Sequence, residues 1–291
     1  MSSATGRYLP VSYFRRLVTD LMHFSAKVPS VTLERRMDLA RLVAARQAST
    51  PAPTWSAIFT KAFALVAART PPLRTSYLTF PWPRFYEHAT SIATLNIDRQ
   101  LADERVVLYA HIPSPEQLTL AEIDAIIHDH QYQPPANIVS YRRARRLSRV
   151  PWPWRRMLWW AALNVLGPAR CHYFGTFGIT SLGSEGAGIT HLVPLLTSQL
   201  HYGMFAPTGE LEMRLSFDHR VLDGVTAARA LADMEAILRG EILHECAASA
   251  RNGTGARAEF PRLSAGINMD RGLQPNSNGS SPQSPFRGEF T

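Results

Sequence analysis

Residues 215–224 place a histidine, His219, four positions before an aspartate, Asp223, and a glycine, Gly224, follows directly. An imidazole has an unperturbed pKa of about 6.5, so it can accept and return a proton at neutral pH. The residues before His219 mix apolar and polar types as a strand does, and those after Gly224 have helical spacing. A histidine at such a junction can be directed into a cleft, so His219 is a candidate general base.

Two adjacent hydroxyl residues, Thr180 and Ser181, stand in a second segment, residues 175–183, with the sequence GTFGITSLG. Acyl transfer from a thioester needs a base for the incoming thiol, hydroxyl or amine. It also needs a hydrogen-bond donor to the oxygen that becomes negative in the tetrahedral intermediate. The Thr180 hydroxyl suits this second task, and Ser181 beside it is a supporting candidate.

Together these segments resemble the acyltransferase core of 2-oxoacid dehydrogenase complexes, in the chloramphenicol acetyltransferase-like superfamily. Residues 14–16 (FRR) and 28–33 (VPSVTL) are similar to the first helix and first strand of that family. The three blocks occur in the order of the family and cover approximately residues 10–243. The resemblance implies an α/β fold, a two-layer α+β sandwich in which helices flank a mixed sheet. It also implies coenzyme A as co-substrate.

The same resemblance implies roles for individual residues. His219 would activate the acceptor for direct transfer without an acyl-enzyme, and Thr180 would stabilise the oxyanion. Asp223 would support the site by pairing with an arginine of the first helix, Arg16 or its neighbour. Gly224 would permit a tight turn. Single-half members of the superfamily build the site between subunits, so a homotrimer, or a multiple of it, is implied.

Departures from the family pattern bear on the substrate. A lipoyl domain with its modifiable lysine and a subunit-binding domain are not found ahead of the core, and Leu-Thr-Ser-Gln at residues 196–199 replaces an Asn-Pro-Pro run. These differences favour a stand-alone enzyme that transfers the acyl group of acyl-CoA to a thiol, hydroxyl or amine. One alternative is an acyltransferase core that acts with a lipoyl domain on another chain. The other is a catalytically silent trimeric scaffold that docks on membranes.

The formal charge of +8 is concentrated in residues 141–170, an addition to the family pattern that holds eight arginines and four tryptophans without an acid. Such a segment suits an anionic membrane surface or the phosphates of coenzyme A. It also fits a solvated helix followed by a helix packed on the domain. Nucleic acid is not favoured, because no nucleic-acid motif accompanies the charge. We expect a cytoplasmic protein with peripheral contact at the inner membrane face.

The elements that must position the site can be predicted from periodicity and breakers. We expect an N-terminal arm (1–9), a catalytic domain (10–247) and a disordered tail (248–291) rich in Gly, Ser, Asn and Pro. Helices are predicted at residues 11–26, 54–68, 118–130 and 225–241, and strands at 28–39, 88–97, 104–112, 189–196, 199–205 and 212–217, with strand structure returning from residue 171. His191 and His201 lie between the two motifs, where they could line the substrate channel, and the favoured interpretation of each is a satisfied polar residue. Two cysteines indicate neither disulfides nor a metal site.

Overall fold

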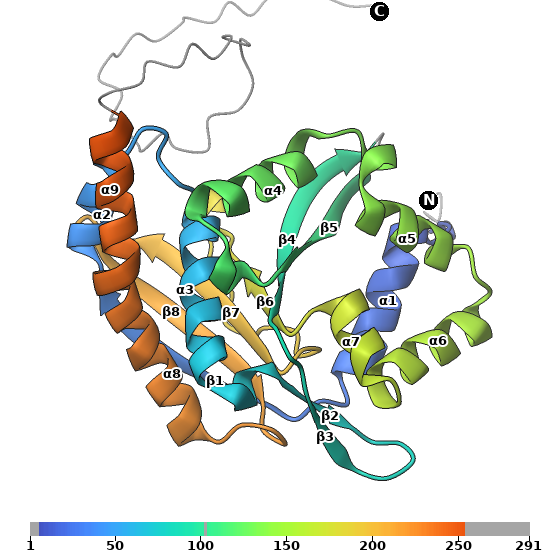
Figure 1. Ribbon diagram of the computed structural model, residues 1–291. Helices are drawn as coiled ribbons and strands as arrows, with labels where there is room; N and C mark the ends of the chain where they lie inside the picture. The colour runs from blue at the N-terminus through green and yellow to red at the C-terminus, as the bar shows by residue number, and fades with distance from the viewer. Residues whose placement is uncertain (1–5, 102–103, 254–291) are drawn as a thin grey trace, which may run out of the picture. The chain divides into compact units, whose positions relative to one another are not determined.

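A computed structural model of the protein describes residues 6–101 and 104–253, which form a mixed sheet with helices on both of its faces (Figure 1). The strands are β1 Ser30–Asp38, β2 Thr75–Leu78, β3 Arg84–Glu87, β4 Ile92–Leu101, β5 Glu104–Pro113, β6 Phe177–Thr180, β7 Ser198–Phe205 and β8 Glu210–Asp218. The helices are α1 Tyr13–Ser25, α2 Ala40–Ala48, α3 Trp55–Arg69, α4 Leu120–Tyr132, α5 Val139–Ser148, α6 Trp152–Asn164, α7 Gly167–Phe174, α8 Gly224–Ile237 and α9 Leu243–Gly253.

The main sheet has six strands in the order β1-β8-β7-β6-β4-β5, and β2 and β3 form a separate hairpin. Strand β6 is parallel to both of its neighbours, β4 and β7, whereas the other pairs are antiparallel. The connection from β5 to β6 carries α4 to α7, and the loop of residues 181–197 joins β6 to β7. This mixed sheet flanked by helices confirms the predicted fold class.

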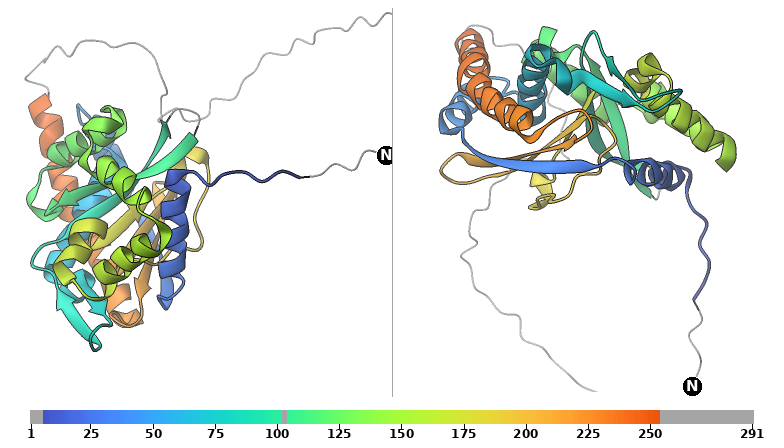
Figure 2. Two further views of the ribbon diagram at one scale, coloured as in Figure 1. Left: turned by 90° about the vertical axis from the view of Figure 1, so that its right-hand side faces the viewer. Right: turned by 90° about the horizontal axis from the view of Figure 1, so that it is seen from below.

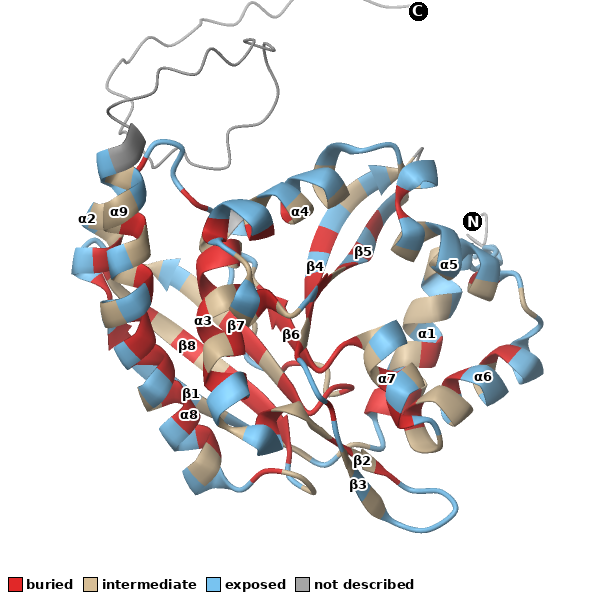
Figure 3. Ribbon diagram, in the orientation of Figure 1, coloured by how far each residue is buried: buried red, intermediate tan, exposed pale blue. Residues whose placement is uncertain are grey.

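The main hydrophobic core lies between one face of the sheet and the helices α2, α3, α4, α8 and α9. Buried residues concentrate on α3 and on the central strands (Figure 3). The Phe63 ring of α3 meets the Phe177 ring of β6 edge to face, with the ring centroids 4.9 Å apart. Helix α3 is apolar on nearly all sides because it is enclosed, as its sequence predicts.

A second group of helices, α1, α5, α6 and α7, lies beside the β4–β5 end of the sheet, and the left view of Figure 2 looks onto it. Its small core contains Phe24 of α1 stacked on Trp159 of α6, with centroids 5.9 Å apart. The carboxylate of Asp20, also on α1, accepts hydrogen bonds from Arg155 and from Arg156. Asp20 and Arg155 are both buried, so this ion pair fixes α6 against α1.

Three predictions of local structure are wrong. Residues 171–174 belong to α7 rather than to a strand: Pro168 stands in the first turn of this helix, and Gly175, with φ of 87°, ends it. Residues 189–196 form no strand, because Pro194 lacks an N–H and the Ile189 N–H is used by His201. Residues 248–253 extend α9 into the predicted tail, whose remainder lies outside the described residues.

Among residues 6–101 and 104–253, no helix has the length and hydropathy needed to cross a membrane.

Candidate active site

His219 lies directly after β8, in the turn that leads to α8, as the sequence predicts. Its backbone N–H donates to the Pro29 carbonyl at 2.9 Å. The side chain is exposed, and no described residue forms a hydrogen bond with its imidazole, which contacts the Phe217 ring at 5.7 Å between centroids. The imidazole is therefore free to engage a substrate or a second copy of the chain.

The two residues that flank His219 form an ion pair. The carboxylate of Asp218, which is fully buried, accepts hydrogen bonds from Arg220 Nε at 2.8 Å, Nη2 at 2.6 Å and the backbone N–H at 3.0 Å. The Arg220 guanidinium also lies over the Tyr77 ring, 4.6 Å from its centroid. A two-point contact of this kind fixes direction as well as distance, so the turn that carries His219 is held at both sides.

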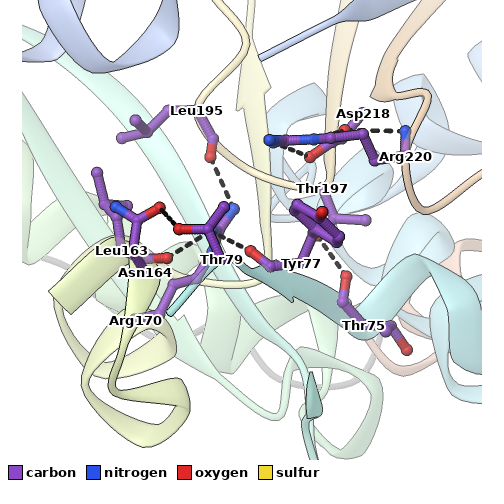
Figure 4. Close-up of polar contacts among 10 residues, drawn as sticks. All are labelled: Thr75, Tyr77, Thr79, Leu163, Asn164, Arg170, Leu195, Thr197, Asp218 and Arg220. Atoms are coloured by element: carbon purple, nitrogen blue, oxygen red, sulfur yellow. Dashed lines mark hydrogen bonds and ion pairs between the residues drawn. The ribbon is translucent and has the colours of Figure 1, made fainter. Parts of the chain in front are cut away.

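Arg170 of α7 lies next to this ion pair and joins four parts of the chain (Figure 4). It donates to the carbonyls of Leu163, Tyr77 and Leu195, at 2.9, 3.2 and 3.1 Å. Burial lowers the pKa of Arg170 to about 10, which leaves it cationic at neutral pH. Arg170 therefore acts as a structural clamp between α6, the β2–β3 hairpin and the 181–197 loop.

Asp223 is the N-cap of α8, and its carboxylate accepts from the Thr226 N–H at 2.7 Å. This hydrogen bond lowers the pKa of Asp223. The expected pairing with Arg16 is not formed: Arg16 Nε donates to the Val11 carbonyl at 3.3 Å, and its guanidinium lies over Tyr13. The exposed amides at the start of α8 engage the carboxylate instead.

The expectation that Gly224 permits a tight turn is also wrong, because its φ is not positive and a Cβ there would meet no atom within 4 Å.

Thr180 is the last residue of β6 and is 7% exposed. Its hydroxyl has no hydrogen-bond partner among the described residues, and its side chain lines a cavity of ≈ 200 Å³. The neighbouring Ser181 hydroxyl donates to the Tyr202 carbonyl at 3.0 Å and accepts from the Gly183 N–H at 3.1 Å. Of the two candidates, Thr180 is thus the one whose hydroxyl is available to a ligand.

His201 supports the backbone of Thr180 from β7. Its Nε2 accepts from the Ile189 N–H at 3.0 Å, so Nδ1 carries the proton that it donates to the Thr180 carbonyl at 3.1 Å. Burial lowers the pKa of His201, in keeping with a neutral ring. The interpretation of His201 as a satisfied polar residue is confirmed, whereas His191 is exposed and lines the ≈ 200 Å³ cavity.

Gly175 is required by crowding where α7 gives way to β6. A Cβ at this position would lie 2.2 Å from Thr94 Oγ1 and 2.9 Å from the Ile92 carbonyl oxygen. Both contacts are far shorter than van der Waals distance, and the positive φ of 87° also disfavours a side chain. The first glycine of the GTF segment therefore lets β6 approach β4 closely.

His219 and Thr180 of one chain lie far apart on the sheet, because Thr180 is level with the middle of β8 whereas His219 follows the end of that strand. Thr180 is aligned with His201 of β7, and His201 with Arg214 of β8. His219 follows Arg214 by five residues. Two strand spacings of about 4.8 Å and five residues at about 3.3 Å each place the two candidates roughly 15–20 Å apart. A single chain therefore does not bring the two candidate groups to one substrate atom.

Sequence reasoning missed the polar residues that β4 and β5 contribute near Thr180. Thr94, Asn96, Tyr109 and His111 line the ≈ 200 Å³ cavity. Their neighbours in sequence, such as Leu95 and Ala110, belong to the main core on the other face of the sheet. The alternation of polar and apolar residues in these strands was the available signal, because successive side chains point to opposite faces.

The sequence matches no protein-family model and no curated protein sequence. Solved structures do match the fold. The dihydrolipoamide acetyltransferase of Azotobacter vinelandii is 18% identical, with a TM-score of 0.59 over 81% of this chain and 93% of that chain. A probable dihydrolipoamide acetyltransferase from Listeria monocytogenes is 19% identical, with a TM-score of 0.57 over 81% and 96%. The truncated catalytic core of the 2-oxoacid dehydrogenase multienzyme complex from Thermoplasma acidophilum is 18% identical, with a TM-score of 0.54 over 81% and 99%. The described chain therefore has the fold of the catalytic cores of dihydrolipoamide acetyltransferases.

Proposed function

We propose that this protein is an acyltransferase that moves an acyl group from acyl-CoA to a thiol, hydroxyl or amine acceptor, with His219 as general base and Thr180 as oxyanion donor. The observation that carries the proposal is the turn after β8. There an exposed imidazole, with no hydrogen-bond partner in the part of the chain that the structure describes, stands between Asp218, fixed by Arg220, and Asp223, fixed by the start of α8. Such a turn fixes the backbone around His219 and leaves its imidazole available.

The proposed reaction is a direct displacement. An imidazole nitrogen of His219 removes the proton of the acceptor as the acceptor atom attacks the thioester carbonyl carbon. The carbonyl oxygen becomes negative and receives a hydrogen bond from the Thr180 hydroxyl. The intermediate then expels the coenzyme A thiolate, which takes the proton from the imidazolium. Acceptor and donor are both bound throughout, so no acyl-enzyme forms.

We further propose that neighbouring copies in a homotrimer supply the two residues of each site, because one chain holds them roughly 15–20 Å apart. For the roles of the individual residues, an analogy comes from the A. vinelandii structure, which concerns the role of a serine, a histidine and an asparagine in the catalytic mechanism. In that enzyme the asparagine follows the histidine by four residues, the spacing between His219 and Asp223. Asp223 is then a positioning residue of the site.

A complementation experiment tests the composite site. We expect Thr180→Val and His219→Ala homotrimers each to have very low activity. Co-expressed 1:1 with different tags, the two variants should regain about a quarter of wild-type activity, because each site needs one particular chain on each side. Acyl-transfer activity is measured as the release of free coenzyme A thiol, with acyl-CoA as donor and with amines, alcohols and dihydrolipoamide as acceptors. Mixed trimers no more active than the separate variants would contradict a site shared between chains.

The acceptor panel also decides between the proposal and its first alternative. A core acting with a lipoyl domain on another chain should prefer dihydrolipoamide over simple amines and alcohols. Activity with free amines or alcohols and none with dihydrolipoamide would favour the stand-alone enzyme.

Peripheral membrane contact is a second proposal, favoured by an exposed surface that α6 shares with the β2–β3 hairpin. Phe80, near the hairpin, packs against Trp160 of α6 at 5.5 Å between centroids. Around them Trp82 is 66% and Trp154 61% exposed. The guanidinium of the half-buried Arg156 lies over the Trp152 ring of α6, 5.0 Å from its centroid, and the exposed arginines of the segment lie on α5 or directly after it. Tryptophans beside guanidinium groups suit the headgroup region of an anionic membrane.

Vesicle binding tests this surface, which we call the α6–hairpin surface. We expect the protein to co-sediment with phosphatidylserine-containing vesicles and the Trp82→Ala/Trp154→Ala variant to bind at least about tenfold more weakly, since buried interfacial aromatics contribute much of such binding. Tyr132→Ala, an exposed aromatic on α4, is the control. Equal sedimentation of both variants would contradict the proposal. Binding by a protein without acyl transfer would favour the silent scaffold.

A further inference from the structure

A cavity of ≈ 680 Å³ lies among α1, α5, α6, α7 and the edge strand β5. This volume falls in the range typical of sites for small organic ligands, about 300–1,000 Å³. Three of its four helices, α5 to α7, belong to the Arg/Trp-rich addition or directly adjoin it. Helices α5 to α7 line this cavity with side chains that have no role in the catalytic chemistry proposed above.

The wall of this cavity is mainly apolar. Its aliphatic and aromatic residues include Leu17, Val18, Val106, Leu158 and Trp159. Burial lowers the pKa of His111, which also lines the wall, to about 4, so this ring is neutral at physiological pH. The arginines of the lining are exposed, which places them at the open side of the cavity. Among the described residues, three buried polar atoms of the lining have no hydrogen-bond partner: His111 Nε2, Ser140 Oγ and Trp159 Nε1. The rest of the interior is mainly apolar and suits a ligand that is largely hydrocarbon.

The cavity adjoins the one that Thr180 lines. The two share six residues: Leu21, Tyr109, His111, Trp159, Tyr173 and Phe174. The two cavities therefore lie side by side, and an apolar chain whose first carbon lies near Thr180 would enter the larger cavity past these shared side chains.

We propose that the ≈ 680 Å³ cavity binds the aliphatic chain of a medium- or long-chain fatty acyl thioester, the acyl donor of the proposed reaction. The proposal rests on the function proposed above. The thioester carbonyl carbon has three substituents: the oxygen, the thiol and the acyl chain. With the oxygen at Thr180, the nucleophile and the leaving thiol must face His219 of another copy. The acyl chain is the group left to extend into the chain that supplies Thr180.

The alternative occupant is the pantetheine arm of coenzyme A, which enters from the arginine-lined mouth. That arm carries two amide groups, each of which needs hydrogen-bond partners, and in the described lining the buried atoms without a partner are only His111 Nε2, Ser140 Oγ and Trp159 Nε1. A hydrocarbon chain has no such requirement. The composition of the wall therefore favours the acyl chain.

Binding and turnover with acyl-CoAs of two lengths test the proposal. We expect dodecanoyl-CoA to bind the wild-type protein, without acceptor, at least about 100-fold more tightly than acetyl-CoA, because each buried methylene adds up to about fourfold. Isothermal titration calorimetry measures this independently of catalysis. The ratio of kcat/KM for dodecanoyl over acetyl transfer should show the same preference.

Cavity-filling variants locate the site. Ala162→Phe on α6 and Ala144→Phe on α5 place rings into the cavity from two walls, and each should lower the dodecanoyl-to-acetyl binding ratio by at least about tenfold. Ala44→Phe, at an exposed position on α2, is the matched control and should keep the ratio. Thermal denaturation identifies a variant that fails to fold, in which case the other variant decides.

The outcomes separate the two proposals. Chain-length-dependent binding that both fillings abolish, in a protein without acyl transfer, would support the cavity assignment and contradict the proposed enzyme. Acyl transfer with equal binding of dodecanoyl-CoA and acetyl-CoA would overturn the cavity assignment alone. A preference for dodecanoyl-CoA that both folded filling variants retain would also overturn it.

Discussion

Replacing His219 with alanine is expected to lower acyl-transfer turnover by about 10²-fold or more, the usual size of a lost general base. The substitution should leave the fold intact, because the imidazole is exposed and has no hydrogen bond to a described residue. The Asp218–Arg220 pair and the Asp223 cap do not involve it. Release of coenzyme A thiol measures turnover, and chemical denaturation measures stability.

The matched control is His244→Ala, since His244 is an exposed histidine on α9. This variant should keep wild-type turnover. Added imidazole should restore part of the activity of His219→Ala if the lost group is a base, whereas a purely structural loss would not respond. Unchanged turnover in His219→Ala, or an equal loss in both variants, would overturn the assignment of His219.

The local parts of the site could be predicted because their signals are local in sequence. The strand before His219 and the helix after Gly224 follow from residue periodicity, and Thr119 and Thr54 mark the starts of α4 and α3. The failures arise where distant residues decide. Residues 189–196 alternate enough to suggest a strand, but the imidazole of His201 engages their first N–H.

Contacts between distant residues could not be read from the sequence. Asp218 and Arg220 flank His219 in the sequence, yet nothing in their spacing shows that they pair with each other or that Arg170 packs beside them.

The arginine-rich segment contains both buried and exposed arginines, and its composition does not reveal which are which. Arg155 and Arg170 are buried and structural, whereas Arg142 and Arg145 of α5 are exposed. The distance between His219 and Thr180 became accessible only through the register of β6, β7 and β8.

Asp20→Ala is expected to lower the free energy of unfolding by about 3–5 kcal/mol, because it leaves the buried guanidinium of Arg155 without its carboxylate. Asp20 is fully buried, and it also accepts from Arg156 Nε at 3.3 Å. Urea denaturation monitored by tryptophan fluorescence measures the loss, since Trp159 packs in the same small core. Asp129→Ala, at an exposed position on α4, should change stability by less than about 0.5 kcal/mol.

A double variant distinguishes the cost of an unpaired charge from a general loss of packing. Asp20→Leu/Arg155→Met replaces the pair by apolar side chains and should recover most of the stability, because it removes both buried charges together. A double variant as unstable as Asp20→Ala would show that the ion pair itself is indispensable to the packing of α6. Since α1 and α6 form two walls of the ≈ 680 Å³ cavity, loosening them in Asp20→Ala should also weaken binding of dodecanoyl-CoA more than that of acetyl-CoA. The buried pair would then connect the stability of the added helices to the choice of acyl chain.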